Sequence, residues 1–253
     1  MKNFRTQHRP KKNSLIAGRK AILECIKSGQ QIDRIYLQSN GYRDMLEDMR
    51  KVAVQHAIPV NYVPLEKLNG FNSGEHGGCI ALISKIRYQN LQQVISWVVD
   101  RGEVPLFLIL DGITDIRNIG GIARTAFCTG VQAIIIPDKG VGALNEDAVL
   151  TSAGALEQLP ICRVNSLMKA VDELRLNGIM VLGSEMTAQK VVFDINLKEP
   201  IAIVLGSEDK GIYPALLKAC DDRFKIPMMG EFESLNVSVA AGMILYEVMK
   251  QRM

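Results

Sequence analysis

The stretch LFLILDGITDIRNIGGIAR, residues 106–124, decides the fold class of this chain. It begins with five consecutive apolar residues, passes through a polar loop and ends in a helical pattern. A short continuous apolar run of this kind is typical of a strand buried on both faces of a parallel sheet. We therefore expect residues 106–110 to form an inner strand of an α/β domain.

Runs of the same kind recur along the second half of the chain. The further predicted strands are AIIIP (133–137), IMVLG (179–183), IAIVL (201–205) and the shorter FKIPM (224–228). The predicted helices between and after them cover about 118–130, 145–154, 166–176, 211–220 and 236–250. Strands that alternate with helices indicate a mostly parallel sheet with helices on both sides.

The first part of the chain has another rhythm and predicts a separate, smaller α/β domain. Its pattern predicts a helix over 14–28 that starts at Ser14, a strand over 32–38, a helix over 42–57, and strands over 59–63 and 79–86. We divide the chain into a basic flexible tail (1–13), a small domain (14–86), a linker with a helix (87–104) and the larger α/β domain (105–253).

The composition indicates a globular protein, with 253 residues, 47% of them hydrophobic and 23% charged. No apolar run approaches the ~18 residues that span a membrane, so we expect no membrane partner. The five cysteines are scattered and odd in number, which predicts reduced thiols and a cytoplasmic location. With three histidines and no paired ligand motif, we expect no metal site.

The positive charge of the chain is concentrated in its tail. Residues 1–13 contain five Lys or Arg and no acid, which gives this segment a charge of +5. Because the net charge of the whole chain is +3, the remaining residues carry −2. A solvated terminus is the ordinary explanation of such a tail. An arm that neutralises RNA phosphates is the more specific one.

Three predicted strands lead into loops that are rich in Gly, Asn, Ser, Asp and Glu. The loops are DGITDIRN (111–118), GSEDKGI (206–212) and MGEFESLN (229–236). Because ligands of parallel α/β sheets bind beyond the carboxyl ends of the strands, we expect these loops to build one pocket. No dinucleotide fingerprint and no Walker A loop occurs at the required place, which disfavours NAD and ATP.

Three motifs together carry a resemblance to a known family. NIGGIART (118–125), IVLGSEDKGI (203–212) and IPMMGEFESLNVSVAAGMILYE (226–247) resemble the signature motifs of the SpoU/TrmH family of RNA 2′-O-methyltransferases, which belongs to the SPOUT class. They stand in the same order and at similar spacing, over essentially all of 105–253. Residues 14–85, which open with SLIAGRKAILECI, resemble the substrate-binding domain of some members, most closely of the RlmB type.

The resemblance implies a fold, a cofactor and partners that spacing alone does not show. It implies a catalytic domain whose C-terminal segment forms a trefoil knot, and a homodimer. It implies S-adenosylmethionine as cofactor and a ribose 2′-hydroxyl of RNA as methyl acceptor. The RlmB-like opening implies a guanosine of 23S rRNA as the target, while a tRNA target stays open.

The resemblance also implies site residues. For catalysis it implies Arg124, Asn118, Glu208, Ser234 and Asn236, and for cofactor binding, through backbone groups, Gly206, Ile226 and Leu235. Ordinary explanations exist for several of them: Asn118, Ser234 and Asn236 precede or begin predicted helices and suit helix capping, and Glu208 suits a solvated turn. We expect Arg124 to clamp a phosphate and orient the hydroxyl, since a guanidinium with a pKa above ~12 is a poor proton acceptor.

Two other function classes stay open at this point. One is an RNA-binding or ribosome-assembly factor that keeps a relic of the site. The other is a small-molecule enzyme with a nucleotide cofactor, which the missing fingerprint and the N-terminal module disfavour.

Overall fold

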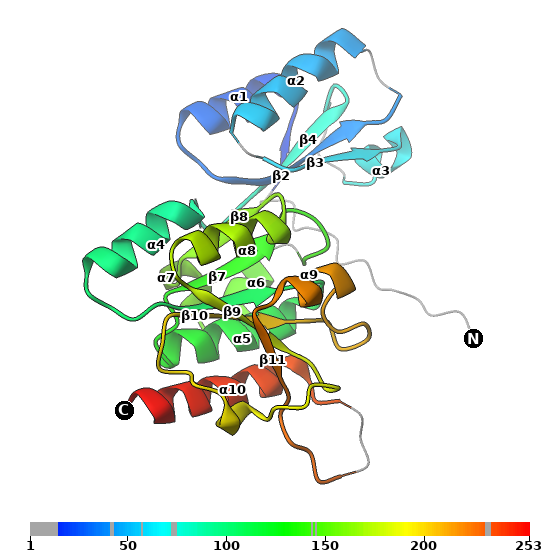
Figure 1. Cartoon of the computed structure of the whole chain (residues 1–253). Helices are drawn as coiled ribbons and strands as arrows, with labels where there is room; N and C mark the ends of the chain where they lie inside the picture. Colours follow the sequence, from blue (N-terminus) through cyan, green and yellow to red (C-terminus); the bar gives the residue numbers. More distant parts are fainter. Residues whose placement is uncertain are drawn as a thin grey trace. The chain divides into compact units, whose positions relative to one another are not determined.

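A computed structural model describes residues 15–40, 43–56, 58–71, 75–142, 144, 146–230 and 234–253. The predicted basic tail (1–13) and Ser14 lie outside the described residues. The chain forms two compact units that divide between Lys85 and Ile86 (Figure 1).

The first unit has a four-stranded sheet in the order β1-β4-β2-β3. Its strands are β1 (Leu15–Ala17), β2 (Ile32–Gln38), β3 (Val60–Val63) and β4 (Cys79–Ile83), and its helices are α1 (Arg19–Lys27), α2 (Arg43–Gln55) and α3 (Leu65–Asn69). β4 runs antiparallel to β1 and β2, and β2 runs parallel to β3. The helix predicted from residue 14 is therefore wrong at its start: residues 15–17 pair with β4, and Gly18 at φ 86° ends that strand before α1 begins.

The second unit has a seven-stranded sheet in the order β11-β9-β10-β6-β7-β8-β5, in which all described pairs are parallel. Its strands are β5 (Tyr88–Gln89), β6 (Leu106–Leu110), β7 (Ala133–Pro137), β8 (Ile161–Val164), β9 (Met180–Ser184), β10 (Ile201–Leu205) and β11 (Asp222–Phe224). Its helices are α4 (Leu91–Asp100), α5 (Ile116–Cys128), α6 (Glu146–Thr151), α7 (Ala155–Gln158), α8 (Leu167–Leu176), the short 3-10 helix η2 (Val192–Asp194), α9 (Pro214–Ala219) and α10 (Val237–Arg252). The predicted mostly parallel α/β sheet is confirmed.

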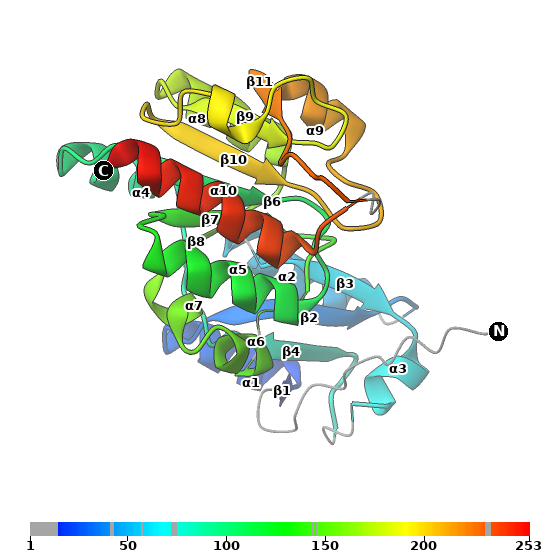
Figure 2. The same ribbon diagram turned by 90° about the horizontal axis from the view of Figure 1, so that it is seen from below.

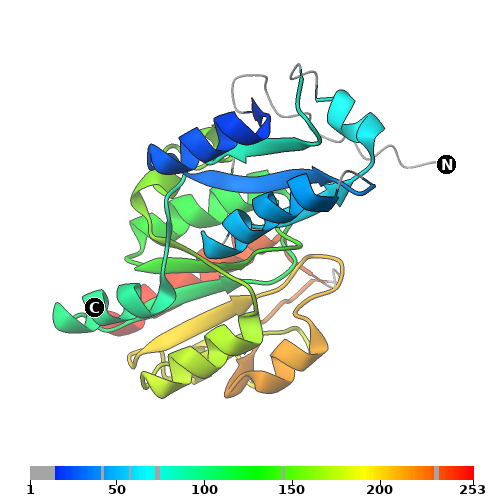
Figure 3. The same ribbon diagram turned by 90° about the horizontal axis from the view of Figure 1, so that it is seen from above.

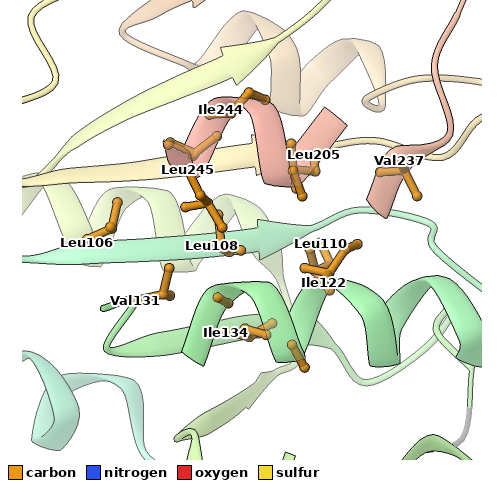
Figure 4. Packing of buried hydrophobic residues seen from close by; sticks show 14 of the residues in the cluster. Leu106, Leu108, Leu110, Ile122, Val131, Ile134, Leu205, Val237, Ile244 and Leu245 are labelled. Atoms are coloured by element: carbon orange, nitrogen blue, oxygen red, sulfur yellow. The ribbon is translucent and has the colours of Figure 1, made fainter. Parts of the chain in front are cut away.

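Strand β6 shows why the sheet is buried on both faces. Leu106, Leu108 and Leu110 point into the core under α5 and α10, and Phe107 and Ile109 point into the core under α4, α8 and α9. Figure 4 shows the first of these cores, where β6 packs against Ile122 of α5 and Leu245 of α10. The continuous apolar run thus supplies two hydrophobic cores at once, through the alternation of side chains along a strand.

The helices divide between the two faces of this sheet. α5 and α10 lie side by side on one face (Figure 2). α8 and α9 pack together on the other, drawn in yellow-green and orange in Figure 3. This division places the first turns of α5 and α10 beside one another, so that polar residues at the two helix starts can contact each other.

Several predicted boundaries differ from the structure. The strand predicted over 224–228 is wrong, because β11 ends at Phe224; it is an edge strand, which tolerates the charged Asp222 and Arg223. The single helix predicted over 145–154 ends at Thr151, and α7 begins only at Ala155, because Ala153 and Gly154 adopt positive φ. The segment predicted as a linker contributes β5 and α4 to the second unit.

Candidate active site

Two of the three polar loops follow parallel strands at the same edge of the sheet. Residues 111–115 follow β6 and lead into α5, and residues 206–213 follow β10, which pairs with β6. The third segment, after β11, leads into α10, the helix that packs against α5. Segments that are distant in the sequence therefore meet at one place.

Asn118, Glu208 and Asn236 form a hydrogen-bond network at this meeting point. The Nδ2 of Asn118 donates to Oε1 of Glu208 at 3.1 Å, and the Nδ2 of Asn236 donates to the same oxygen at 2.6 Å. Asn236 also donates to Oδ1 of Asn118 at 3.0 Å, and the backbone N–H of Val237 donates to Glu208 at 3.2 Å. The carboxylate of Glu208 thus fixes the start of α5 and the start of α10 relative to its own loop.

Capping accounts for part of this arrangement. Oδ1 of Asn236 accepts hydrogen bonds from the backbone N–H groups of Ser238 at 3.0 Å and Val239 at 3.4 Å, so Asn236 caps α10. Asn118 has no such role, because α5 begins at Ile116 and is capped by Asp115. The side chain of Asn118 is therefore available to the network.

Arg124 is not brought to the network within this chain. It lies on α5 six residues after Asn118, about 9 Å along the helix axis and on a different side of the helix. Its side chain is exposed, and no described residue forms a hydrogen bond or an ion pair with its guanidinium. Among the described residues, Arg124 is thus a cation without an ionic partner.

A cavity of about 330 Å³ opens beside the network. All three residues predicted to bind the cofactor, Gly206, Ile226 and Leu235, line it, and so do Glu208 and Ser234. Further lining comes from Leu205, Ile212, Val237 and Ala240. The cavity therefore combines apolar walls with a polar end that it shares with the network.

Gly206 shapes this cavity through the absence of a side chain. A Cβ atom at this position would lie 2.1 Å from the carbonyl carbon of Gly211 and 2.2 Å from the nitrogen of Ile212. The loop is closed on itself by hydrogen bonds between the backbones of Ser207 and Gly211, at 2.8 and 3.2 Å. Only glycine permits this close approach of two backbone segments at the cavity wall.

The charges of the cavity fit the cofactor that the resemblance implies. Two carboxylates, Glu185 and Glu208, line it, and none of the described residues that line it is Lys or Arg. S-adenosylmethionine carries a sulfonium and an ammonium group and a single carboxylate, so its net charge is positive, which a cavity with two carboxylates favours. The apolar lining suits an adenine ring.

Sequence reasoning missed Glu185 and Thr187, which line the cavity at the carboxyl end of β9. The hydroxyl of Thr187 donates to Oε1 of Glu185 at 2.7 Å. The available signal was the acidic residue that directly follows a buried parallel strand, where ligand-binding side chains of α/β sheets gather.

The described residues contain neither a membrane-spanning helix nor a cluster of metal ligands. No helix in the described ranges is long and apolar enough to cross a membrane. No group of three or more His, Cys, Asp or Glu residues in the same ranges is placed to hold a metal ion.

Comparisons with known proteins match both units. Residues 105–246 match the model of the SpoU rRNA Methylase family, and residues 15–89 match the model of the RNA 2′-O ribose methyltransferase substrate-binding domain. A Bacillus subtilis protein named for the TrmH family of tRNA/rRNA methyltransferases is 33% identical over 94% of this chain and 95% of its own. A Staphylococcus haemolyticus protein with the same family designation is 37% identical over 94% and 96%.

Solved structures agree with these matches. The SpoU methyltransferase AviRb of Streptomyces viridochromogenes, in complex with AdoMet, is 25% identical, with a TM-score of 0.60 over 94% of this chain and 90% of its own. An AdoMet-bound rRNA methyltransferase of Sinorhizobium meliloti shares the fold, with 20% identity and a TM-score of 0.61 over 94% and 87%.

Proposed function

The chain belongs to the SpoU/TrmH family of RNA methyltransferases, which use S-adenosylmethionine, and from this premise we propose that it methylates a ribose 2′-hydroxyl of a guanosine in 23S rRNA. The observation that carries the proposal is the position of the network of Asn118, Glu208 and Asn236 at one end of the cavity lined by Gly206, Ile226 and Leu235. A methyl donor in the cavity and an acceptor at the network are then neighbours.

The cofactor supplies an activated methyl group, so the protein has to position the acceptor hydroxyl and help its proton leave. Backbone groups of Gly206, Ile226 and Leu235 hold the cofactor, and the carboxylates of Glu185 and Glu208 favour its positive charge. Ser234 lines the cavity and offers its hydroxyl at the polar end, where a ribose also offers hydroxyls. Asn118 and Asn236 keep Glu208 in place at this end, because their Nδ2 groups donate to its Oε1. Glu208 acts by holding the two asparagines in place.

Arg124 has a separate part in this proposal. Its exposed guanidinium, which has no partner among the described residues, suits the phosphate beside the target ribose, which it binds through two parallel N–H groups. Such a clamp orients the 2′-hydroxyl without accepting its proton. A lysine at this position lacks the planar fork and replaces it poorly.

The RNA class is proposed on two grounds. The first unit matches a substrate-binding domain of RNA 2′-O ribose methyltransferases, and its opening motif resembles the RlmB type. Relatives are named for both tRNA and rRNA, so a tRNA substrate is the alternative outcome of the experiment below. A cytoplasmic location stays a prediction from the five cysteines.

We also propose a homodimer that forms through α5 and α10. Val239, Met243 and Tyr246 are exposed at spacings of four and three residues, so they form one apolar stripe on α10. Phe127 adds an exposed ring on the neighbouring α5. The opposite side of α10 is buried in the core, and a helix that is apolar on both sides is typical of a helix between two packed layers.

The trefoil knot implied by the family stays part of the proposal. Two segments support it: the one after β10, with Gly206, and the one after β11, with Ile226 and Leu235, line the same cavity. In a knotted chain these two segments would thread past one another.

The test is methyl transfer from labelled S-adenosylmethionine to unmodified 23S rRNA and to unmodified tRNA, with mapping of any 2′-O-methyl group. We expect one methylated guanosine in the rRNA. Label in tRNA alone would retain the chemistry and overturn the rRNA assignment. RNA binding without transfer to either RNA would support the assembly-factor alternative.

A further inference from the structure

A second cavity lies at the same edge of the sheet, on the side of α8 and α9. Its volume is about 270 Å³, and it opens at the carboxyl ends of β6 and β7. The buried side chains of Leu167 and Leu216 form an apolar part of its wall. Tyr213, Met168 and Lys139 line it with exposed side chains.

Tyr213 places an exposed aromatic side chain at this cavity. Its side chain is 66% exposed, and no described residue accepts or donates a hydrogen bond at its hydroxyl. Its backbone is nevertheless held firmly, because its N–H donates to Oδ2 of Asp111 at 2.6 Å. The chain thus presents a large aromatic ring from a fixed backbone position, beside a cavity with apolar walls.

The loops that line this cavity also carry residues of the proposed methyl-transfer site, although the two cavities share no described lining residue. Asp111 follows β6, and its N–H donates to the carbonyl of Leu205 at the end of β10. Tyr213 stands two residues after Gly211, which closes the loop that carries Glu208. The same loops therefore carry the Glu208 network and the ring of Tyr213.

We propose that this second cavity binds a nucleobase of the RNA substrate, from a nucleotide next to the methylated one, stacked on the ring of Tyr213. A base has apolar faces that match Leu167, Leu216 and the tyrosine ring, and stacking on aromatic side chains is how proteins hold unpaired bases of structured RNA. Lys139 at the cavity supplies a cation for the phosphate of that nucleotide. This inference rests on the proposed function, because it takes the RNA substrate from it.

The first test measures equilibrium binding of unmodified 23S rRNA and of unmodified tRNA to the full chain and to variants at position 213. We expect Tyr213→Ala to weaken binding of the substrate RNA by about 10-fold, within the roughly 5- to 150-fold that one base–aromatic stack contributes. Tyr213→Phe and Tyr213→Trp retain a ring and should bind within about twofold of the wild type. Binding of S-adenosylmethionine and the thermal midpoint should not change, since the side chain is exposed.

The matched control is Phe193→Ala, which removes a 55% exposed aromatic side chain from η2 and should leave RNA binding unchanged. Wild-type affinity of Tyr213→Ala, or an equal loss in Tyr213→Phe, would overturn the stacking role. Because binding is measured apart from methyl transfer, a wild-type chain that transfers no methyl group contradicts the proposed function without deciding this inference.

A positional measurement completes the test. A photoreactive benzoylphenylalanine at position 213 should crosslink to a nucleotide within two positions of the methylated one, as mapped by reverse transcription. A crosslink at a remote nucleotide only would contradict the placement of the base.

Discussion

Asn236 allows its capping role and its site role to be separated by substitution. Asn236→Ala removes both, because the side chain caps α10 through Oδ1 and holds Glu208 and Asn118 through Nδ2. Asn236→Ser retains a capping oxygen and loses the amide donor. Loss of an N-cap costs about 1 kcal/mol, within a range of roughly 0.5–2 kcal/mol. For a unit of this size, that lowers the thermal midpoint by about 2–4 °C.

We therefore expect Asn236→Ala to lower the midpoint by about 2–4 °C and Asn236→Ser to stay close to the wild type. Both variants should lose methyl transfer, because the bond of 2.6 Å from Nδ2 to Glu208 is absent in both. Thermal unfolding and methyl transfer to the RNA substrate at saturating cofactor are the two assays.

The matched control is Asn90→Ala. Asn90 caps α4 by accepting from the N–H of Gln93 at 3.1 Å, and α4 follows β5, the edge strand at the opposite end of the sheet from β11. This variant should show the same fall in midpoint with full methyl transfer. Wild-type methyl transfer by Asn236→Ser would refute any role of this residue beyond capping.

Three further predictions concern other residues. Gly206→Ala should weaken S-adenosylmethionine binding, measured by calorimetry, by about 100-fold, because the new Cβ would collide with the backbone of Gly211 and Ile212 and overpacking costs about 1–3 kcal/mol. The control is Gly242→Ala, whose Cβ would lie 3.9 Å from Thr125 and which should bind the cofactor normally. Arg124→Ala and Arg124→Lys should lower methyl transfer by about 100-fold or more and leave cofactor affinity intact; wild-type turnover contradicts the clamp. Burial raises the pKa of Cys162 to about 12 and that of Cys220 to about 11. The native chain then holds protons that the unfolded chain releases, so the free energy of unfolding should fall as the pH rises above the ordinary thiol value toward 11–12, and denaturant titrations should show a smaller fall in Cys162→Ala.

The inner strands of the larger sheet were predictable from the sequence, because a strand that is buried on both faces consists of a continuous run of apolar residues. Residues 106–110, 133–137 and 201–205 are strands with the predicted bounds. β8 was missed because ICRV contains Arg163, whose guanidinium lies over the ring of Tyr88, 3.8 Å from its centroid. A charged residue satisfied by a partner 75 positions away leaves no local pattern.

The cofactor residues came from motif resemblance, and their meeting at one cavity is a property of topology. Gly206 and Ile226 are 20 residues apart, and Leu235 lies beyond a further loop. Glu185 and Tyr213 were not singled out, because an acid or an aromatic residue after a strand is common and only the cavities give these two a context.

The separation of Arg124 from Glu208 has a physical consequence for the proposed chemistry. An arginine paired with Glu208 would have to exchange that ion pair for a phosphate, and the net gain from RNA would be small. The amide groups of Asn118 and Asn236 satisfy Oε1 of Glu208 instead, without any positive charge. The guanidinium of Arg124 therefore has no ion pair with a described residue to break before it binds a phosphate, while the loop of Glu208 stays fixed before the substrate arrives. On this view, Glu208→Ala, which removes the oxygen that accepts from Asn118, Asn236 and Val237, should disturb the order of the network and leave the phosphate contact of Arg124 intact. The rate of methyl transfer should then fall more than the affinity for RNA. An equal loss of both would show that Glu208 and Arg124 act as one unit.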